Sequence, residues 1–171
     1  MAAKSALREY QRQLMERLEA AGESAAPRSS QLAFESGGEN WLLRLNDIAE
    51  VIALPAITPV PLARDWFCGL ANVRGTLYGI ADFAGLTGRP LTVAGAENRL
   101  LLLAAHVIRG SGLLVGRIAG LRNPEQFKPS PAGRAAIPWV RALLQDEAGV
   151  DWNELDAPQL VRRPEFLQAG I

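Results

Sequence analysis

The stretch Trp66–Gly88, WFCGLANVRGTLYGIADFAGLTG, decides the fold of this chain. It contains two β-like runs, Gly69–Val73 and Thr76–Asp82, joined at the tight pair Arg74-Gly75. Bulky side chains stand among small residues here without strict alternation, which is typical of strands buried on much of both faces. We therefore predict a pair of strands at the centre of the domain.

Three polar residues interrupt this apolar stretch: Asn72, Arg74 and Asp82. Arginine is rarely left unpaired in a buried setting, so Arg74 requires a carboxylate, a row of carbonyl groups or a partner protein. Glu50 is its expected partner within the chain, because each of the two is the only charge in an apolar run. Two interpretations stay open: a purely structural pair, or a pair that presents a charged edge to another protein.

Outward from this stretch, Gly and Pro residues separate many short apolar segments. We predict a hairpin of Leu32–Glu35 with Asn40–Leu45 about a turn at Gly37-Gly38. A strand at Ile48–Leu54 and an extended proline-bearing link along a sheet edge follow it. The further predicted elements are one helical turn at Arg64–Phe67, a hairpin of Arg99–Val107 with Ser111–Leu121, strands at Ile137–Leu144 and Val150–Leu155, and a terminal helix at Ala157–Leu167 interrupted at Pro164. Many short strands with such punctuation indicate one or two small antiparallel barrels, so the fold class is mainly β.

The N-terminal region is expected to be separate from this β domain, with residues 1–30 forming a helix and a linker and residues 31–171 the domain. Apolar residues recur at three- and four-residue steps over Lys4–Ala21, which predicts an amphipathic helix. Glu23–Ser30 has the composition of a flexible linker. The helix either packs on its own domain or docks onto a partner, and the sequence favours neither.

Composition narrows the class of protein. Lys plus Arg and Asp plus Glu both number 18 in 171 residues, and the balanced charge argues against nucleic acid as the main ligand. The single cysteine, Cys68, is expected to be a small buried hydrophobe rather than a reactive thiol. No secretory signal and no long apolar run is present in the sequence, so we expect a soluble cytosolic protein.

The sequence contains no recognisable catalytic motif. His106 is the only histidine and is expected at a core or edge position rather than at a metal. An acidic cluster near the C-terminus is interpreted as solvated loop charge rather than as a cation site; it comprises Asp146, Glu147, Asp151, Glu154 and Asp156. We therefore expect no catalytic residue, metal or cofactor, with a small-ligand binder or enzyme using a barrel mouth as the alternative.

Large side chains near Arg74 are instead suited to protein contacts. Trp66, Phe67, Leu70 and Tyr78 stand close to it in sequence, and aromatic residues beside an arginine are typical of interface centres. For Trp66 and Phe67 an ordinary position in the core is the favoured interpretation.

Two spaced motifs resemble those of CheW-like proteins, which couple chemoreceptors to their histidine kinase. Asn72–Gly75 (NVRG), followed by Tyr78–Phe83 (YGIADF), resembles the family core N-x-R-G-x-x-x-P-x-x-D-L. Ile48–Val51 (IAEV) resembles the family's V-x-E-I, and Ser111–Val115 (SGLLV) its G-L-x-V. The resemblance covers about Gln31 to Leu155. The chain departs from it in having Gly79 in place of the family's Pro and Gly116 where an Asp usually follows.

The resemblance implies two intertwined five-stranded, SH3-like barrels with a hydrophobic groove between them, and no catalysis. It also implies that one barrel binds the regulatory domain of a CheA-like kinase and the groove binds the cytoplasmic tip of a methyl-accepting receptor. Within the family, the chain is most similar to couplers of type IV pilus (twitching) pathways. The similarity lies in the predicted N-terminal helix, in the sequence of Trp66–Gly85 and in the C-terminal segment Trp152–Leu167. The alternative within the family is a coupler of flagellar chemotaxis.

The expected protein is thus a cytoplasmic adaptor in membrane-bound receptor arrays, which meets the membrane only through the receptor. Its expected partner-binding residues are Glu50, Val51, Leu70, Asn72, Val73, Arg74 and Asp82. In this hypothesis the apolar members provide contact area, while Glu50 and Arg74 fix the register of docking. Loss of Arg74 is expected to weaken receptor docking and to leave the fold largely intact.

Overall fold

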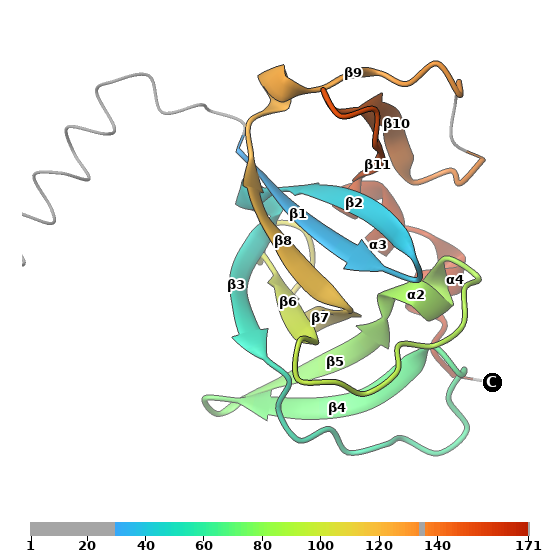
Figure 1. Cartoon of the computed structure of the whole chain (residues 1–171). Coiled ribbons are helices and arrows are strands. Elements are labelled where there is room, and N and C mark those ends of the chain that lie inside the picture. The colour runs from blue at the N-terminus through green and yellow to red at the C-terminus, as the bar shows by residue number, and fades with distance from the viewer. Residues whose placement is uncertain (1–29, 134–135, 171) are drawn as a thin grey trace, which may run out of the picture.

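The computed structural model describes residues 30–133 and 136–170, which form two β-sheets and a few short helices (Figure 1). This confirms the predicted mainly β class. The elements are, in chain order, β1 (Gln31–Ser36), β2 (Glu39–Arg44), η1 (Leu45–Asp47), β3 (Ile48–Ala53), β4 (Phe67–Val73), β5 (Thr76–Asp82), α2 (Phe83–Leu86), β6 (Arg99–Leu103), β7 (Ser111–Val115), β8 (Arg117–Arg122), η2 (Pro124–Gln126), β9 (Lys128–Pro129), β10 (Val140–Gln145), β11 (Asp151–Leu155), α3 (Ala157–Val161) and α4 (Pro164–Leu167). The predicted N-terminal helix at Lys4–Ala21 lies outside the described residues.

The two sheets differ in detail from the expected pair of five-stranded antiparallel barrels. One has five strands in the order β3-β6-β7-β5-β4, and the other has six in the order β8-β1-β2-β11-β10-β9. Each sheet contains one parallel pair, β5 with β7 and β2 with β11. In both pairs a long connection separates the two strands along the chain, and only such connections allow neighbouring strands to run in the same direction.

The chain returns from the five-stranded to the six-stranded sheet at Gly116, between β7 and β8. The backbone N–H of Gly116 donates to the carbonyl oxygen of Glu35 at 3.0 Å. A Cβ atom at position 116 would lie 2.8 Å from the same oxygen, so a side chain does not fit this crossing. The single strand predicted over Ser111–Leu121 is therefore wrong in one respect: the crossing divides it between two sheets.

The link between β3 and β4 runs along the outer edge of β4, which confirms the predicted extended edge segment. Thr58 and Leu70 exchange two backbone hydrogen bonds of 2.8 and 2.9 Å. Gly69 makes this approach possible, because a Cβ atom there would lie 2.1 Å from the carbonyl oxygen of Thr58. The helical turn predicted at Arg64–Phe67 is wrong, since the chain only turns there and Phe67 already begins β4.

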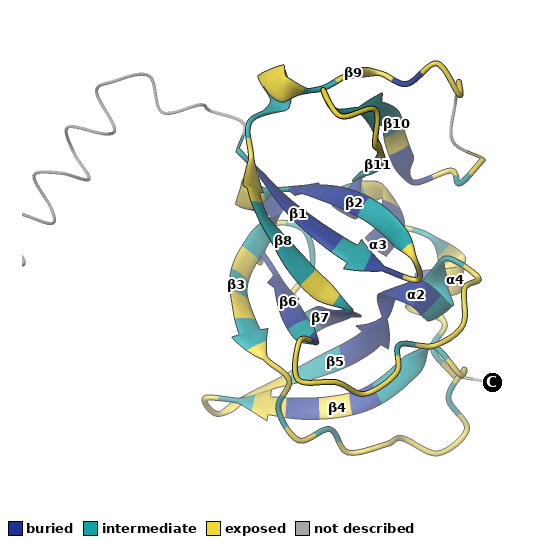
Figure 2. Cartoon of the chain, viewed as in Figure 1, coloured by how far each residue is buried: buried dark blue, intermediate teal, exposed yellow. Residues whose placement is uncertain are grey.

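Apolar side chains fill the space between the sheets and the interior of each sheet. Figure 2 shows how buried and exposed residues are distributed over the strands. Leu101 and Leu103 of β6 face the core between the sheets, whereas Leu100 and Leu102 face the interior of the five-stranded sheet. Strands buried on both faces carry continuous apolar runs, which explains the lack of alternation in β6 and β7. The core between the sheets is centred on aromatic rings, with Trp41 4.7 Å from Phe83 and 5.8 Å from Trp139 between centroids.

Trp66 and Phe67 are half-buried, and Trp66 packs against the core between the sheets. Its ring stacks on that of Phe166 in α4, with centroids 6.2 Å apart and planes 11° from parallel. This confirms for Trp66 the interpretation as a core residue and joins the C-terminal helix to the start of β4. Within the described residues, no helix has the length and apolar character that crossing a bilayer requires.

We predict that Gly69→Ala destabilises the fold by at least about 3 kcal/mol. The added methyl group collides with the backbone of Thr58, and the φ of +130° at Gly69 disfavours any side chain. Gly170→Ala is the control, because nothing lies within 4 Å of a Cβ atom there. Urea denaturation measures both variants, and equal stability of the two would contradict this account of the β4 edge.

Candidate partner-binding site

Arg74 lies at the tip of the β4–β5 hairpin. Val73 pairs with Thr76 across the turn, and Arg74 and Gly75 have φ values of +53° and +86°. These angles are those of a two-residue type I′ turn, in which a residue with a Cβ atom costs about 1 kcal/mol relative to glycine. The side-chain oxygen of Asn72 accepts a 2.8 Å hydrogen bond from the N–H of Gly75 and fixes the turn.

Glu50 of β3 and Arg74 form a bidentate ion pair, which confirms the pairing predicted from the sequence. Nη1 of Arg74 donates to Oε2 of Glu50 at 2.8 Å, and Nη2 donates to Oε1 at 2.6 Å. The arginine side chain is nevertheless 74% exposed and that of Glu50 36% exposed, so the expectation of a buried setting was wrong. The hydrogen bonds from Arg74 lower the pKa of Glu50, while partial desolvation opposes the shift.

This ion pair joins the two outer strands of the five-stranded sheet. β3 and β4 are its first and last strands, so Glu50 and the turn after β4 lie far apart in the strand order. The direct contact between them shows that the sheet curls until its two edges approach each other. An exposed ion pair of this kind contributes little to stability.

Apolar side chains are exposed on the strands that carry the pair and on β5. Leu70 and Asn72 point outward from β4, because the alternate residues Ala71 and Val73 pack into the interior of the sheet. Val51 of β3, Leu70 and Leu77 of β5 are 37%, 38% and 61% exposed. We name this set the edge surface; it comprises Glu50, Val51, Leu70, Asn72, Arg74 and Leu77.

The structure places two of the expected site residues elsewhere. Val73 is half-buried and packs into the interior of the five-stranded sheet. Asp82 is 3% exposed, and its carboxylate caps α2 by accepting from the N–H of Gly85 at 3.1 Å. The same carboxylate also accepts from the N–H and the hydroxyl of Thr92, at 2.8 and 3.1 Å. These contacts give Asp82 a role inside the fold, so we leave it out of the edge surface.

Leu77 is the member of the edge surface that the sequence-based prediction missed. It pairs with Asn72 across the hairpin, so both side chains point to the same face of the sheet. Alternation along β5 would not have found it, because the successive residues Leu77–Ala81 (LYGIA) show no alternation of polar and apolar side chains. Pairing outward from the Arg74-Gly75 turn gives the correct face.

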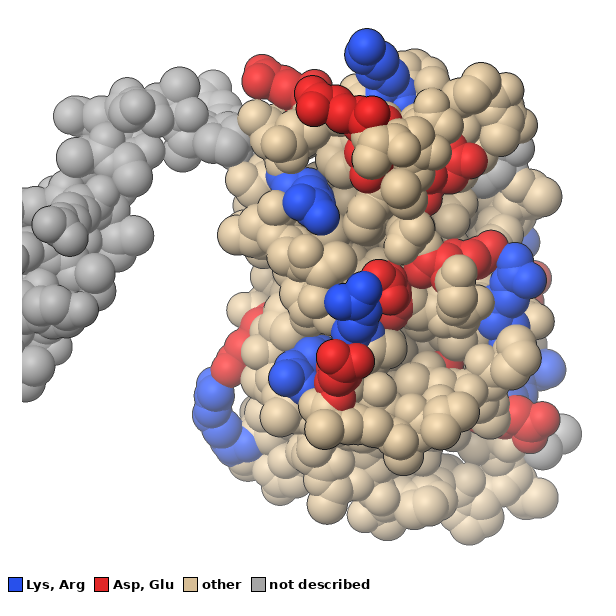
Figure 3. Space-filling view, viewed as in Figure 1, with Lys and Arg blue, Asp and Glu red and all other residues tan. Residues whose placement is uncertain are grey.

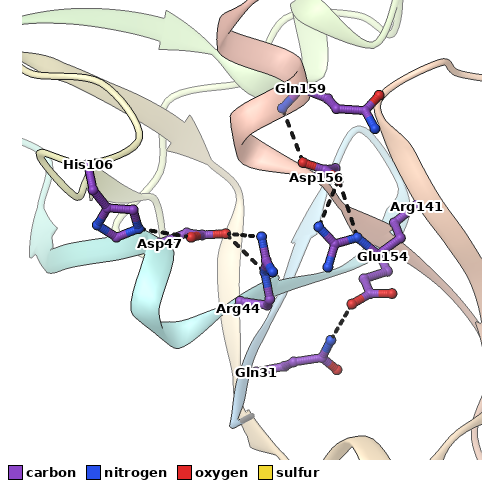
Figure 4. A network of polar contacts seen from close by, with 8 residues as sticks. All are labelled: Gln31, Arg44, Asp47, His106, Arg141, Glu154, Asp156 and Gln159. Carbon is purple, nitrogen blue, oxygen red and sulfur yellow. Dashed lines mark hydrogen bonds and ion pairs between the residues drawn. The ribbon is translucent and has the colours of Figure 1, made fainter. Parts of the chain in front are cut away.

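On the face shown in Figure 3, acidic and basic side chains lie next to one another over the middle and lower part, and several acidic side chains gather at the top. His106 also has an acidic neighbour: its exposed ring lies with Nε2 3.2 Å from Oδ1 of the buried Asp47 (Figure 4). Arg44 pairs with the other oxygen of Asp47, also at 3.2 Å. The strand predicted over Arg99–Val107 ends at Leu103, so His106 lies in the loop after β6 and not at the expected core or edge position. Its contact ties this loop to η1.

The acidic C-terminal residues have structural partners, so their interpretation as solvated loop charge was incomplete. Asp156 is buried and pairs with Arg141 at 2.8 Å, and it caps α3 through the N–H of Gln159 (Figure 4). Burial opposes its charge, but these bonds outweigh burial and lower the pKa of Asp156. Glu154 accepts a 2.9 Å hydrogen bond from Gln31. Residues 30–133 and 136–170 contain no cluster of three or more His, Cys, Asp or Glu placed to hold a metal ion.

Cys68 is half-buried beside the interior of the five-stranded sheet. Burial and the charge of Asp82 raise the pKa of its thiol to about 11. The thiolate, which is the reactive form, is therefore scarce near neutral pH. This agrees with the expected role as a small apolar residue.

Known proteins match this chain in sequence and in fold. A family model described as "CheW-like domain" matches residues 31–165. Protein PilI of Pseudomonas aeruginosa is 27% identical over 148 residues, which cover 83% of this chain and 80% of that protein. The crystal structure of the scaffolding protein TtCheW from Thermoanaerobacter tengcongensis superposes with a TM-score of 0.66 and 18% identity, covering 80% of this chain and 94% of that one. The last similarity establishes the fold.

We predict that Asp82→Ala lowers the free energy of unfolding by about 2 kcal/mol, because it removes a helix cap and leaves the amide of Thr92 unpaired. Thermal and urea unfolding measure the loss. The folded fraction should still bind protein partners like the wild type. Selective loss of partner binding without loss of stability would return Asp82 to the site.

We predict that the pKa of the Glu50 carboxyl group is below that of an unpaired glutamate in the wild type. In Arg74→Gly this lowering of the pKa should disappear. The pair's contribution to stability is present above the unfolded-state pKa of about 4.3 and is lost as the pH falls through the lower folded-state value. Carbon-detected NMR of the carboxyl groups measures both. Asp146, whose pKa is lowered by the N–H of Val150 and by Trp152, is the internal control. An unchanged Glu50 titration in Arg74→Gly would contradict the pairing.

Proposed function

The chain belongs to the CheW-like domain family, and we propose that it is a non-enzymatic adaptor that couples a pilus-associated methyl-accepting chemoreceptor to a CheA-like histidine kinase in twitching motility. The similarity to PilI supports the assignment to a pilus system. In this role the chain takes no cofactor and reaches the membrane only through the receptor, within cytoplasmic arrays.

The edge surface is the observation that carries the proposal. It combines the exposed apolar side chains of Val51, Leu70 and Leu77 with a charge pair whose two members neutralise each other. Apolar residues beside an arginine are typical of the centre of a protein interface. The balanced charge of the chain argues against nucleic acid as its main ligand, and basic side chains of the described residues do not gather on the face shown in Figure 3.

Arg74 has a conformation that stability does not explain. Its backbone lies in the left-handed region, where glycine is favoured, and its ion pair is exposed and worth little. Because neither its backbone conformation nor its ion pair stabilises the fold much, we explain the presence of an arginine at position 74 by a contact with another protein. The bidentate bond to Glu50 holds the guanidinium in position at the tip of the hairpin, which reduces the conformational entropy lost when a partner binds it.

We assign the edge surface to the kinase regulatory domain. It lies wholly on the five-stranded sheet, and the family resemblance gives the kinase to one barrel and the receptor to the groove between barrels. The expectation from sequence that Arg74 serves receptor docking stays a prediction, so the test below includes both partners. Signal transfer then requires only that docking at one surface changes the affinity at the other.

Binding of purified kinase regulatory domain and of a receptor signalling tip is measured by calorimetry with the wild type, Arg74→Glu and the double variant Glu50→Arg/Arg74→Glu. Arg74→Glu places two carboxylates together and should weaken kinase binding about tenfold or more. The double variant restores an ion pair with reversed polarity. It should recover the thermal stability of the wild type without recovering kinase binding.

Arg117→Glu is the matched control, because Arg117 of β8 makes a bidentate pair with Glu35 of β1 in the six-stranded sheet and is also half-exposed. It should leave kinase binding unchanged. If the double variant bound the kinase like the wild type, Glu50 and Arg74 would serve only to close the sheet. If neither partner bound the wild type, the adaptor role itself would be wrong.

A further inference from the structure

We propose that the amphipathic segment Lys4–Ala21 docks onto its own domain, on an apolar surface at the point where the chain enters β1. We name this the entry surface; it comprises Leu45, Ile118 and Leu121. It shares no residue with the edge surface, and the proposal does not depend on the adaptor role.

The entry surface flanks the first described residue, Ser30, on two sides. On the side of β2, the N–H of Leu45 donates to the carbonyl oxygen of Ser30 at 3.0 Å. On the other side, the end of β8 lies along the start of β1, where Leu121 pairs with Leu32 (Figure 1). Position 30 thus lies between Leu45 and Leu121, and the residues before it continue from this point of the domain.

The entry surface is apolar and lies at an open edge of the six-stranded sheet. Leu45 and Leu121 are 38% and 61% exposed. Ile118 and Leu121 pair with Phe34 and Leu32, whose side chains lie in the core between the sheets. Paired residues point to the same face, so the two β8 side chains extend this core outward. Among the described strands β8 pairs only with β1, and an edge strand with exposed apolar side chains needs a cover.

The width of the entry surface matches the apolar stripe of the segment. Leu45 follows β2 and Leu121 lies on β8, so two strand spacings, about 10 Å, separate them across the sheet. In the helix that the sequence predicts, Leu7 and Leu14 lie on one face, and the rise per residue places them about 10 Å apart. Leu18 extends the same stripe by one turn. One face of the segment can therefore contact both exposed leucines.

The short connection to β1 favours the chain's own segment over any other occupant. Only residues 22–29 separate the segment from Ser30. Fully extended they reach about 27 Å, which is enough to turn back over a surface that begins beside Ser30. A short tether gives an effective concentration in about the millimolar range, so even a weak apolar contact is populated. A second copy or a separate partner has to bind the same leucines without this advantage.

The test is NMR of the full chain with isotopically labelled leucine methyl groups, which detects contacts between them. We expect contacts of Leu7 or Leu14 with Leu45 and Leu121, at the same strength in dilute and concentrated samples. Absence of these contacts would overturn the proposal. Contacts found only between labelled and unlabelled molecules of a mixed sample would assign the entry surface to a second copy. Coverage of Leu121 only after addition of the kinase regulatory domain would assign it to that partner, and either result would also overturn the proposal.

Two pairs of variants separate docking from folding, which the spectrum of the rest of the domain checks. Leu14→Asp should shift the methyl resonances of the entry surface, whereas Gln13→Asp places the same charge outside the apolar stripe and should leave them unchanged. Leu121→Asp should speed amide exchange in residues 4–21 at least about threefold, because it removes an apolar contact of the docked segment. Leu167→Asp, on α4 and 62% exposed, is its control. Equally fast exchange of residues 4–21 in the wild type and both variants would contradict docking at this surface.

Discussion

The burial of central strands on both faces is the constraint on which the rest of this structure depends. β6 contributes side chains to the interior of its own sheet and to the core between the sheets, and β1 and β2 do the same on the other side. Each large side chain buried in this way contributes about 1.5–3 kcal/mol relative to exposure. The shared core leaves only the outer strands and the loops free for partners, and even this core carries an unpaired indole N–H at Trp41.

The two outer strands of the five-stranded sheet are protected from unwanted pairing in different ways. The link through Thr58 covers one side of β4, which requires the absence of a side chain at Gly69. β3 is paired only with β6, and its one charge is neutralised by Arg74. An apolar edge strand without free charge is prone to unwanted association unless a partner covers it. In the proposed adaptor role a partner protein covers this edge, and the ion pair limits which partner fits.

Much of the fold follows from local sequence signals, and the site follows in part. Two lone charges in apolar runs were enough to predict the contact between Glu50 and Arg74, because an arginine needs a carboxylate wherever it lies. The bonds between Asp82 and Thr92 were not predictable, since Thr92 lies ten residues away in an irregular loop. The crossing at Gly116 was missed for a similar reason. A close approach of two backbones from different sheets leaves no trace in the sequence except a glycine.

The exposure of the Arg74 side chain could not be deduced from its neighbours in the sequence. An arginine in an apolar hairpin suggests burial, but a two-residue turn projects its residues beyond the end of both strands. The parallel pairs β5 with β7 and β2 with β11 likewise depend on long-range order, because a parallel neighbour is separated by a long connection. Sequence patterns predicted where most strands lie along the chain, whereas only the structure gave the order of the strands in each sheet.

The central claim is that the edge surface is covered by another protein. Amide hydrogen exchange of the chain, measured alone and with a saturating kinase regulatory domain, tests this most directly. The account predicts that β3 and the β4–β5 hairpin gain protection in the complex, while the β10–β11 turn exchanges at the same rate in both. Protection of the six-stranded sheet alone, with β3 and the hairpin unchanged, would contradict it.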